Sequence, residues 1–209
     1  MTAHCTVGAV ACHFAPSVGH ITGIDITPEM IWQALKAQAD RGLANMTWQV
    51  GAAYTRSFAD AAFSLVITRY SLHHFQNPPA VVSELIRVLE PGGRLLIADV
   101  AQPSDKATGY DEIELLRDPS HVHALTREEF AGLFVSTQLG PARFAEYKVE
   151  MSLESQLSAS FPVPGGADRI REMLREDVGV DRCGVGAHWV GSELHYAVPI
   201  VVGVAAKLR

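Results

Sequence analysis

Short apolar runs rich in β-branched residues alternate with amphipathic helical patterns, and this alternation most constrains what the chain can fold into. Residues 20–26 (HITGIDI) predict a buried strand, and Thr27-Pro28 after it predicts a helix start with Thr27 as N-cap. Residues 46–50 and 63–68 predict two further strands. Strands that alternate with helices form βαβ units and pair in parallel. The sequence therefore predicts an α/β fold.

The clearest strand signal lies at residues 94–98 (RLLIA), after a helix that opens at Asn77-Pro78 and carries an apolar stripe. Pro91-Gly92-Gly93 predicts the end of that helix and the turn into the strand, which has Asp99 at its carboxyl end. Weaker downstream patterns predict helices at about residues 127–138 and 167–178, and strands near residues 143–151 and 194–204.

Length and composition narrow the class of protein. The 209 residues predict one domain spanning residues 1–209. A net charge of −6 argues against nucleic acid and anionic membrane as partners, and no apolar run reaches the roughly 20 residues of a membrane-spanning helix. The N-terminal residues lack a signal-peptide pattern, and Cys5, Cys12 and Cys183 form no closely spaced pair. These features predict a cytoplasmic protein with reduced thiols and no metal.

In open α/β sheets, ligands bind outside the carboxyl ends of the parallel strands. This rule nominates the N-terminal turn and three segments that follow predicted strands, residues 25–30, 51–54 and 69–75. The last segment holds His73 and His74, either of which fits a general base because the pKa of a histidine lies near about 6.5. Arg69 fits a carboxylate of a ligand. The alternatives are packing or loop support for the histidines and a structural salt bridge for Arg69.

Four strings carry a resemblance to a known family: GIDITPEM, WQVGA, FSLVITRYSLHHF and RVLEPGGRLLIADV, with RDPSHVHALT as a further piece. They resemble the ubiquinone/menaquinone methyltransferase branch of the class I S-adenosylmethionine-dependent methyltransferases, over roughly residues 8–130. The resemblance implies a Rossmann-like, doubly wound, mostly parallel sheet with an antiparallel last strand. It implies a cofactor-binding core in residues 1–140, and a substrate-side cover with the final strands in residues 141–209. It also implies S-adenosyl-L-methionine as the cofactor and a small molecule as the methyl acceptor.

The residues that the resemblance assigns to the cofactor are Gly8, Asp25, Ile26, Met30, Ala52, Ala53 and Arg69. Asp25 would accept hydrogen bonds from both ribose hydroxyls, as a carboxylate at a strand end does in dinucleotide folds. Ile26 and Met30 would supply apolar walls against the adenine, and Gly8 would face the methionine end. The alternative for Asp25 is a role in capping the helix that follows it.

The chain departs from the family pattern in its glycine-rich loop and at the adenine edge. Only Gly8 matches the end of the loop, because His4 and Thr6 stand where the family favours glycine and Thr2 stands where it favours an acid. Ala52 replaces the usual aspartate that accepts from the adenine amino group. Two lost charged partners, at about 1.5–3 kcal/mol each, predict an affinity loss of about a hundredfold to ten-thousandfold.

The family's first strand lies in the middle of the sheet, and residues 1–7 supply only a short version of it. A missing central strand leaves backbone groups of its neighbours unpaired, which is costly. Either these few residues pair with the sheet or another subunit fills the gap, so a homodimer is left open as a partner.

Three functions are consistent with these residues. The first is a methyltransferase acting on a small molecule with impaired cofactor binding. The second is a degenerate relative without methyl transfer that serves as a non-catalytic partner subunit. The third is a repurposed esterase-like hydrolase built from residues such as Ser71, His74 and Asp99. His121 and His123 form an HxH without a well-spaced companion ligand, which favours a substrate-side loop over a metal site.

Overall fold

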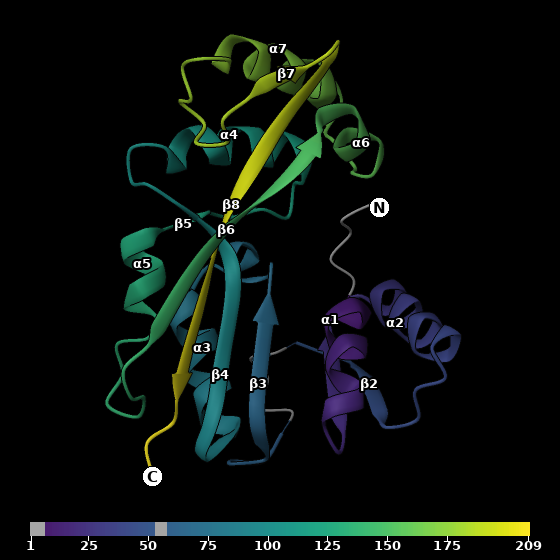
Figure 1. The fold of residues 1–209 in the computed structure, drawn as a ribbon, viewed down its shortest axis with the longest axis vertical. Helices are drawn as coiled ribbons and strands as arrows, with labels where there is room; N and C mark the ends of the chain where they lie inside the picture. The colour runs from purple at the N-terminus through teal and green to yellow at the C-terminus, as the bar shows by residue number, and fades with distance from the viewer. Residues whose placement is uncertain (1–6, 53–57) are drawn as a thin grey trace.

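The computed structural model describes residues 7–52 and 58–209, and its strands form two sheets (Figure 1). The small sheet pairs β1 (Ile21–Asp25) with β2 (Met46–Val50). The large sheet has the order β3-β4-β8-β6 and contains β3 (Phe63–Arg69), β4 (Leu89–Gln102), β6 (Arg143–Ser152) and β8 (Glu193–Ala206). Two short strands, β5 (Leu125–Thr126) and β7 (His188–Val190), pair with β4 and β8.

Strand directions agree with the prediction of a mostly parallel sheet whose last strand is antiparallel. β1 and β2 are parallel, as are β3 and β4, where Arg69 lies beside Ala98. The last strand, β8, runs antiparallel to both β4 and β6. The carboxyl ends of β3 and β4 therefore meet at one edge of the large sheet, which is the edge where ligands bind in such folds.

Seven α-helices and two short 3-10 helices connect the strands in the described part of the chain. They are α1 (Val7–Phe14), η1 (Ala15–Ser17), α2 (Pro28–Asp40), η2 (Leu72–His74), α3 (Pro78–Val88), α4 (Ala107–Arg117), α5 (Arg127–Gly132), α6 (Leu153–Ser158) and α7 (Gly166–Asp177). None of the helices in the described ranges is long and apolar enough to cross a bilayer.

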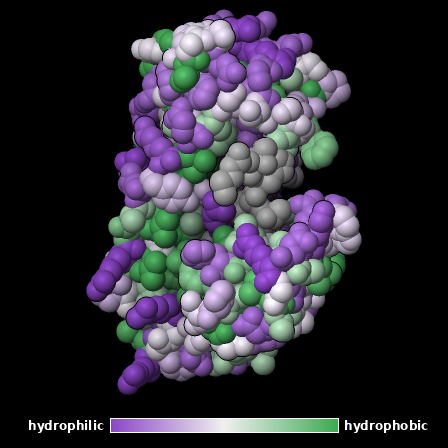
Figure 2. Space-filling view, turned by 45° about the vertical axis from the view of Figure 1, so that its right-hand side comes forward, coloured by the Kyte–Doolittle hydropathy of each residue, from purple (hydrophilic) through white to green (hydrophobic). Residues whose placement is uncertain are grey.

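Three clusters of buried side chains form the core. One packs α3 and α5 against β4 and β8, and a second packs α4, α6 and α7 against the other half of β8. The third is smaller and joins α1 to β2 through Cys12, Ala15 and Met46. Figure 1 shows α1 and α2 with the small sheet on one side of β3, while α4, α6 and α7 gather at the far end of β8. Hydrophilic residues dominate that far end in Figure 2, as expected of helices that cover a core and face water.

The ends of α3 are fixed by two polar side chains. The Asn77 side chain accepts from the backbone nitrogen of Ala80 at 3.2 Å, which caps the first turn. At the other end, Lys207 Nζ donates to the carbonyl oxygens of Ile86 (2.8 Å) and Leu89 (2.7 Å). A cation that satisfies the last carbonyls of a helix also complements its dipole.

The structure differs from the sequence-based prediction near the N-terminus. Residues 4–10 were expected to form the end of a glycine-rich loop, but α1 already begins at Val7. The short first strand expected in residues 1–7 falls outside the described residues except for Val7, which is helical. Gly8 lies so close to α2 that an added Cβ would come within 2.9 Å of the Ala34 Cα. A residue without a side chain lets the two helices approach closely.

Two predicted helix ends were wrong by several residues. α3 ends at Val88 rather than at Pro91-Gly92-Gly93, because β4 begins at Leu89 and takes up these residues in an irregular stretch beside β3. Gly92 has φ +84° there, a conformation that favours glycine. α5 stops at Gly132 rather than near residue 138, and the chain continues with the buried Leu133 and Phe134.

Candidate functional site

The carboxyl end of β1 presents a carboxylate and an exposed apolar side chain. Asp25 Oδ1 accepts from the backbone nitrogen of Thr27 at 2.8 Å, and this bond closes a turn before α2 without reaching the backbone nitrogens of the helix's first turn. Ile26 follows it and is 68% exposed, while Met30 lies half-buried in the first turn of α2. Ala52 follows the adjacent strand β2, with its neighbour Gly51 bonded to the Asp25 carbonyl at 2.9 Å.

These placements bring several predicted cofactor residues to one edge of the small sheet. Asp25, Ile26, Met30 and Ala52 all lie where β1 and β2 end. Ala53, also predicted there, lies outside the described residues. The edge offers an anionic acceptor beside exposed apolar surface, which is the combination that suits a nucleoside.

Arg69 ends β3 and faces the N-terminal helix. With four residues of α1 it lines an open hollow of about 310 Å³. Its guanidinium carbon lies 4.0 Å from the ring centre of Tyr70, a cation–π contact. Tyr70 has φ 53°, which is strained for a side chain of this size, and its hydroxyl lies 3.0 Å from that of Tyr147 on β6. Burial and this hydroxyl contact raise the pKa of Tyr70 well above its usual range.

His73 of η2 is held by a buried carboxylate of β4. Asp99 is 1% exposed and lies 2.6 Å from His73 Nδ1 through its Oδ1 atom. Asp99 also accepts from the backbone nitrogens of Ser71 (2.9 Å), Leu72 (2.7 Å) and Val100 (2.8 Å). Burial opposes a charge on His73, but the hydrogen bond to Asp99 and its negative charge outweigh it, so the pKa of His73 is raised.

His74 lies beside His73 and is shifted in the opposite direction. The two ring centres are 4.2 Å apart. Burial and the neighbouring His73 lower the pKa of His74. His74 Nδ1 contacts Ser120 twice, at 3.0 Å to the backbone oxygen and at 3.1 Å to Oγ. As the pH falls, His73 therefore takes up a proton before His74 does.

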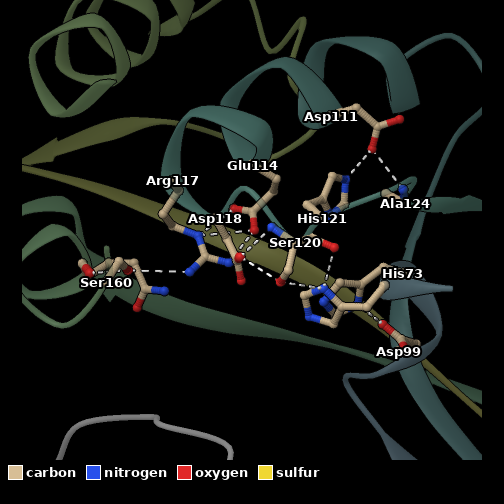
Figure 3. Close-up of polar contacts among 12 residues, drawn as sticks. His73, Asp99, Asp111, Glu114, Arg117, Asp118, Ser120, His121, Ala124 and Ser160 are labelled. Carbon is tan, nitrogen blue, oxygen red and sulfur yellow. Dashed lines mark hydrogen bonds and ion pairs between the residues drawn. The ribbon is translucent and has the colours of Figure 1, made fainter. Parts of the chain in front are cut away.

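The loop after α4 supports this pair, and Figure 3 shows its side chains converging below α4. Asp118 Oδ1 accepts from the backbone nitrogen (2.9 Å) and the hydroxyl (2.7 Å) of Ser120. His73 in turn accepts on its backbone oxygen from the nitrogens of Val122 (2.9 Å) and His123 (3.2 Å). The loop and η2 are thus joined by side-chain and backbone bonds.

The HxH pair lies in the loop after α4 and binds a carboxylate of that helix. Asp111 accepts from His121 Nε2 and His123 Nδ1, each at 2.7 Å, and from the backbone nitrogen of Ala124 at 2.7 Å. His123 Nε2 also lies 3.2 Å from Glu129. Within residues 7–52 and 58–209, no group of three or more His, Cys, Asp or Glu side chains is arranged to hold a metal ion.

The structure does not assemble Ser71, His74 and Asp99 into the triad considered for a hydrolase. Asp99 binds His73 rather than His74, and the Nδ1 atom of His74 is directed to Ser120. The Ser71 hydroxyl pairs with the Thr68 hydroxyl at 2.5 Å.

Sequence reasoning missed Asp118 and Ser120 as parts of the site. Both belong to the string RDPSHVHALT, which the resemblance singled out without a role for either residue. The spacing Asp-x-Ser is typical of a turn in which the aspartate bonds the backbone two residues later. That signal predicts the turn, but the contact with His74 depends on the packing of α4 and η2.

Comparison with known proteins bears on the family and the fold of the chain. A family model described as a methyltransferase domain matches residues 3–97. The chain is 30% identical over 171 residues to YcgJ of Bacillus subtilis, named an uncharacterized methyltransferase, and the match covers 80% of this chain and 66% of YcgJ. It is 25% identical over 167 residues to the ubiquinone/menaquinone biosynthesis C-methyltransferase UbiE of Pseudomonas putida, covering 78% of this chain and 62% of UbiE. The chain thus spans less than two thirds of the length of the curated relatives named here.

The crystal structure of YcgJ shares the fold, with a TM-score of 0.87, 24% identity, and coverage of 98% of this chain and 89% of YcgJ. The parallel pairing of β3 with β4 and the antiparallel β8 agree with the fold that the sequence resemblance implies. S-adenosylmethionine is the cofactor of the methyltransferases that the chain resembles. From the sequence match and the shared fold together, the chain carries a methyltransferase domain with the fold of the class I S-adenosylmethionine-dependent methyltransferases.

Proposed function

We propose that the protein transfers a methyl group from S-adenosylmethionine to a small molecule whose acceptor atom carries a proton. The observation that carries this proposal is the pair of adjacent histidines at the end of β3, whose pKa values are shifted in opposite directions. Pairs of titratable groups pushed apart in this way mark acid and base roles in enzymes. His74, the ring of the pair that more readily stays neutral, fits a general base at the carboxyl edge of the sheet.

The residues at the two sheet edges fit the cofactor. Asp25 would accept from the ribose hydroxyls, and the exposed Ile26 with Met30 would cover the adenine. Arg69 would bind the carboxylate at the methionine end, beside the hollow lined by α1. Gly8, packed against α2, would let the start of α1 come close to the same end. When bound, the sulfonium supplies an electrophilic methyl group.

We also propose that cofactor binding is weaker than is usual for the family. The methyl side chain of Ala52 cannot accept a hydrogen bond from the adenine amino group, although this residue follows the strand that pairs with the Asp25 strand. One lost hydrogen bond to a charged group is worth about 1.5–3 kcal/mol, which is about a tenfold to hundredfold loss of affinity. Ala53 remains part of the proposed adenine edge.

Calorimetric titration with S-adenosylmethionine and S-adenosylhomocysteine tests the cofactor. We expect measurable binding to the wild type, a tightening of about tenfold to hundredfold in Ala52→Asp, and loss of binding in Asp25→Ala. Ala80→Asp adds the same charge at an exposed position in the first turn of α3 and is expected to leave the affinity unchanged. Absence of heat at millimolar ligand for both the wild type and Ala52→Asp would overturn the proposal and favour the non-catalytic partner subunit.

The esterase-like alternative has a separate test. Ester hydrolysis that persists without cofactor and disappears in His74→Ala would favour it over methyl transfer. The proposed function expects instead that release of S-adenosylhomocysteine with a suitable acceptor falls in His74→Ala. Full methyl transfer by that variant would remove His74 as the base.

A further inference from the structure

We propose that Asp118 and Ser120 are positioning residues that hold the proton of neutral His74 on Nδ1, so that Nε2 is the atom that receives the proton of the methyl acceptor. This inference rests on the proposed function for its use in catalysis, but the placement of the proton follows from the contacts of the ring alone. It assigns a role to two residues of a loop that sequence reasoning placed on the substrate side without a function for either of them.

The chemistry of the two contacts to Ser120 decides which nitrogen is protonated. A backbone carbonyl accepts hydrogen bonds and never donates one. Since His74 Nδ1 lies 3.0 Å from the Ser120 backbone oxygen, Nδ1 must be the donor. In a neutral imidazole only one nitrogen carries a proton, so Nε2 keeps its lone pair.

Asp118 makes the second contact agree with the first. A hydroxyl group can donate or accept, so Ser120 Oγ at 3.1 Å from His74 Nδ1 leaves the direction open by itself. Asp118 Oδ1 lies 2.7 Å from the same Oγ, and a carboxylate only accepts. The Ser120 hydroxyl therefore donates to Asp118 and turns its lone pairs towards His74. Both oxygens of Ser120 then accept from the same N–H.

Asp118 also orients the carbonyl. Its Oδ1 atom accepts from the backbone nitrogen of Ser120 at 2.9 Å, which closes a turn and fixes the peptide that carries the accepting oxygen. The same loop is tied to η2 by the bond from Val122 to the His73 carbonyl at 2.9 Å. The acceptor and the ring that it orients are therefore held in one unit. Figure 3 shows Asp118 and Ser120 of this unit between α4 and Asp99.

The groups that face His74 keep the two histidines distinct. His73 donates its own Nδ1 proton to Asp99, so the ring with the raised pKa lies on the Asp99 side. The charge on His73 lowers the pKa of His74, whereas the carboxylates of Asp118 and Asp99 raise it. Loss of the Asp118 charge should consequently lower the pKa of His74 further, apart from any change of tautomer.

The proton balance of the reaction gives this arrangement its purpose. As the acceptor forms a bond to the methyl carbon, the carbon–sulfur bond breaks and its electron pair stays on sulfur as a neutral thioether. The acceptor loses its proton to His74 Nε2. The resulting imidazolium keeps its Nδ1 proton, which stays hydrogen-bonded to Ser120, until solvent removes the proton from Nε2. An acceptor with a hydroxyl, a thiol or an acidic C–H group needs this base, whereas an acceptor without a removable proton does not.

Nitrogen-15 NMR of histidine-labelled protein tests the proposal without a substrate. The His74 resonances, assigned by their loss in His74→Gln, report both the tautomer and the pKa. We expect the wild type to carry the proton on Nδ1 above the pKa of His74. Asp118→Ala should shift the population towards the Nε2–H form, whereas Asp118→Asn should retain Nδ1–H because its amide oxygen still accepts from Ser120. Both variants should lower the pKa of His74, because both remove the charge.

The outcomes separate this proposal from the proposed function. A wild-type ring protonated on Nε2 would overturn the role of both Asp118 and Ser120, and a tautomer that Asp118→Ala leaves unchanged would overturn the role of Asp118, whatever the cofactor does. If Asp118→Ala does not fold, the wild-type tautomer decides alone. A failure to bind S-adenosylmethionine, with the expected tautomer present, would overturn the methyltransferase function and leave the proton placement standing.

Discussion

Asp99 is a buried polar side chain whose removal should strongly destabilise the fold. It is 1% exposed and accepts hydrogen bonds from His73 and from the backbone nitrogens of Ser71, Leu72 and Val100. Asp99→Ala would leave these donors buried without an acceptor. Breaking a buried ion pair by removing one partner costs about 3–5 kcal/mol, which is a large share of the about 5–15 kcal/mol that stabilises a typical protein. For a chain of this length the midpoint of thermal unfolding should fall by about 6–20 °C.

Urea unfolding followed by tryptophan fluorescence and circular dichroism measures this loss. The comparison is Asp168→Ala, the same chemical change at a side chain that is 84% exposed and paired with Arg171 on the surface. Exposed pairs contribute little because water screens them. Asp99→Asn keeps one accepting oxygen and should fall between the two. If Asp99→Ala unfolds at the same urea concentration as Asp168→Ala, the buried network does not stabilise the edge as we infer.

Three further outcomes are expected from the contacts described above. The raised pKa of His73 means that the stability from its pair with Asp99 is complete below about pH 6.5 and is lost as the pH rises through the higher pKa of the folded state. In urea unfolding, the loss of unfolding free energy caused by His73→Gln should therefore be larger at mildly acidic than at alkaline pH, and an equal loss at both would contradict this. Lys207→Met should cost about 1–3 kcal/mol in the same assay, because carbonyls at the end of α3 lose their donor; no loss would mean that water replaces it. Gly8→Ala should destabilise the packing of α1 on α2 by about 1–3 kcal/mol, seen as faster hydrogen exchange in both helices, because the new methyl group meets Ala34; unchanged exchange would show that the helices adjust.

Strong local signals allowed much of the fold to be predicted. Thr27-Pro28 and Asn77-Pro78 mark helix starts found in the structure, and the β-branched runs at residues 63–68 and 94–98 lie within β3 and β4. The periodicity of α7 placed that helix to within one residue at either end. Such elements are specified by neighbours in sequence, so their patterns survive without knowledge of the fold.

Elements that depend on tertiary packing were missed. α1 (VGAVACHF) is apolar on most positions and contains Gly8, so its sequence has no helical face, and it is held by packing against α2. α4 contains Thr108-Gly109, a poor helical pair, and Gly109 is required because an added Cβ would meet the Arg182 carbonyl at 2.8 Å. Close approach between segments far apart in sequence leaves no periodic signal.

The same distinction holds for the candidate site. The positions of Asp25, Arg69 and His74 at strand ends could be predicted, because the strand pattern fixes which residues follow each strand. Which histidine binds Asp99 could not be predicted, since the choice depends on how η2 turns after the strained Tyr70. Strain of this kind is visible only in the backbone and not in the residue order.

The division of the strands between two sheets has a mechanical consequence. In the parts of the chain that the structure describes, no backbone hydrogen bond joins the small sheet to the large one, and the small sheet packs on a core cluster of its own. Segments bonded and packed in this way can open locally at a lower free energy than the whole protein. A nucleoside-sized ligand bound by Asp25 of the small sheet and by Arg69 of the large sheet would oppose such opening, since it would bind only while both sheets are folded. With the ligand bound, the small sheet and the large sheet would then unfold in one cooperative transition instead of opening separately.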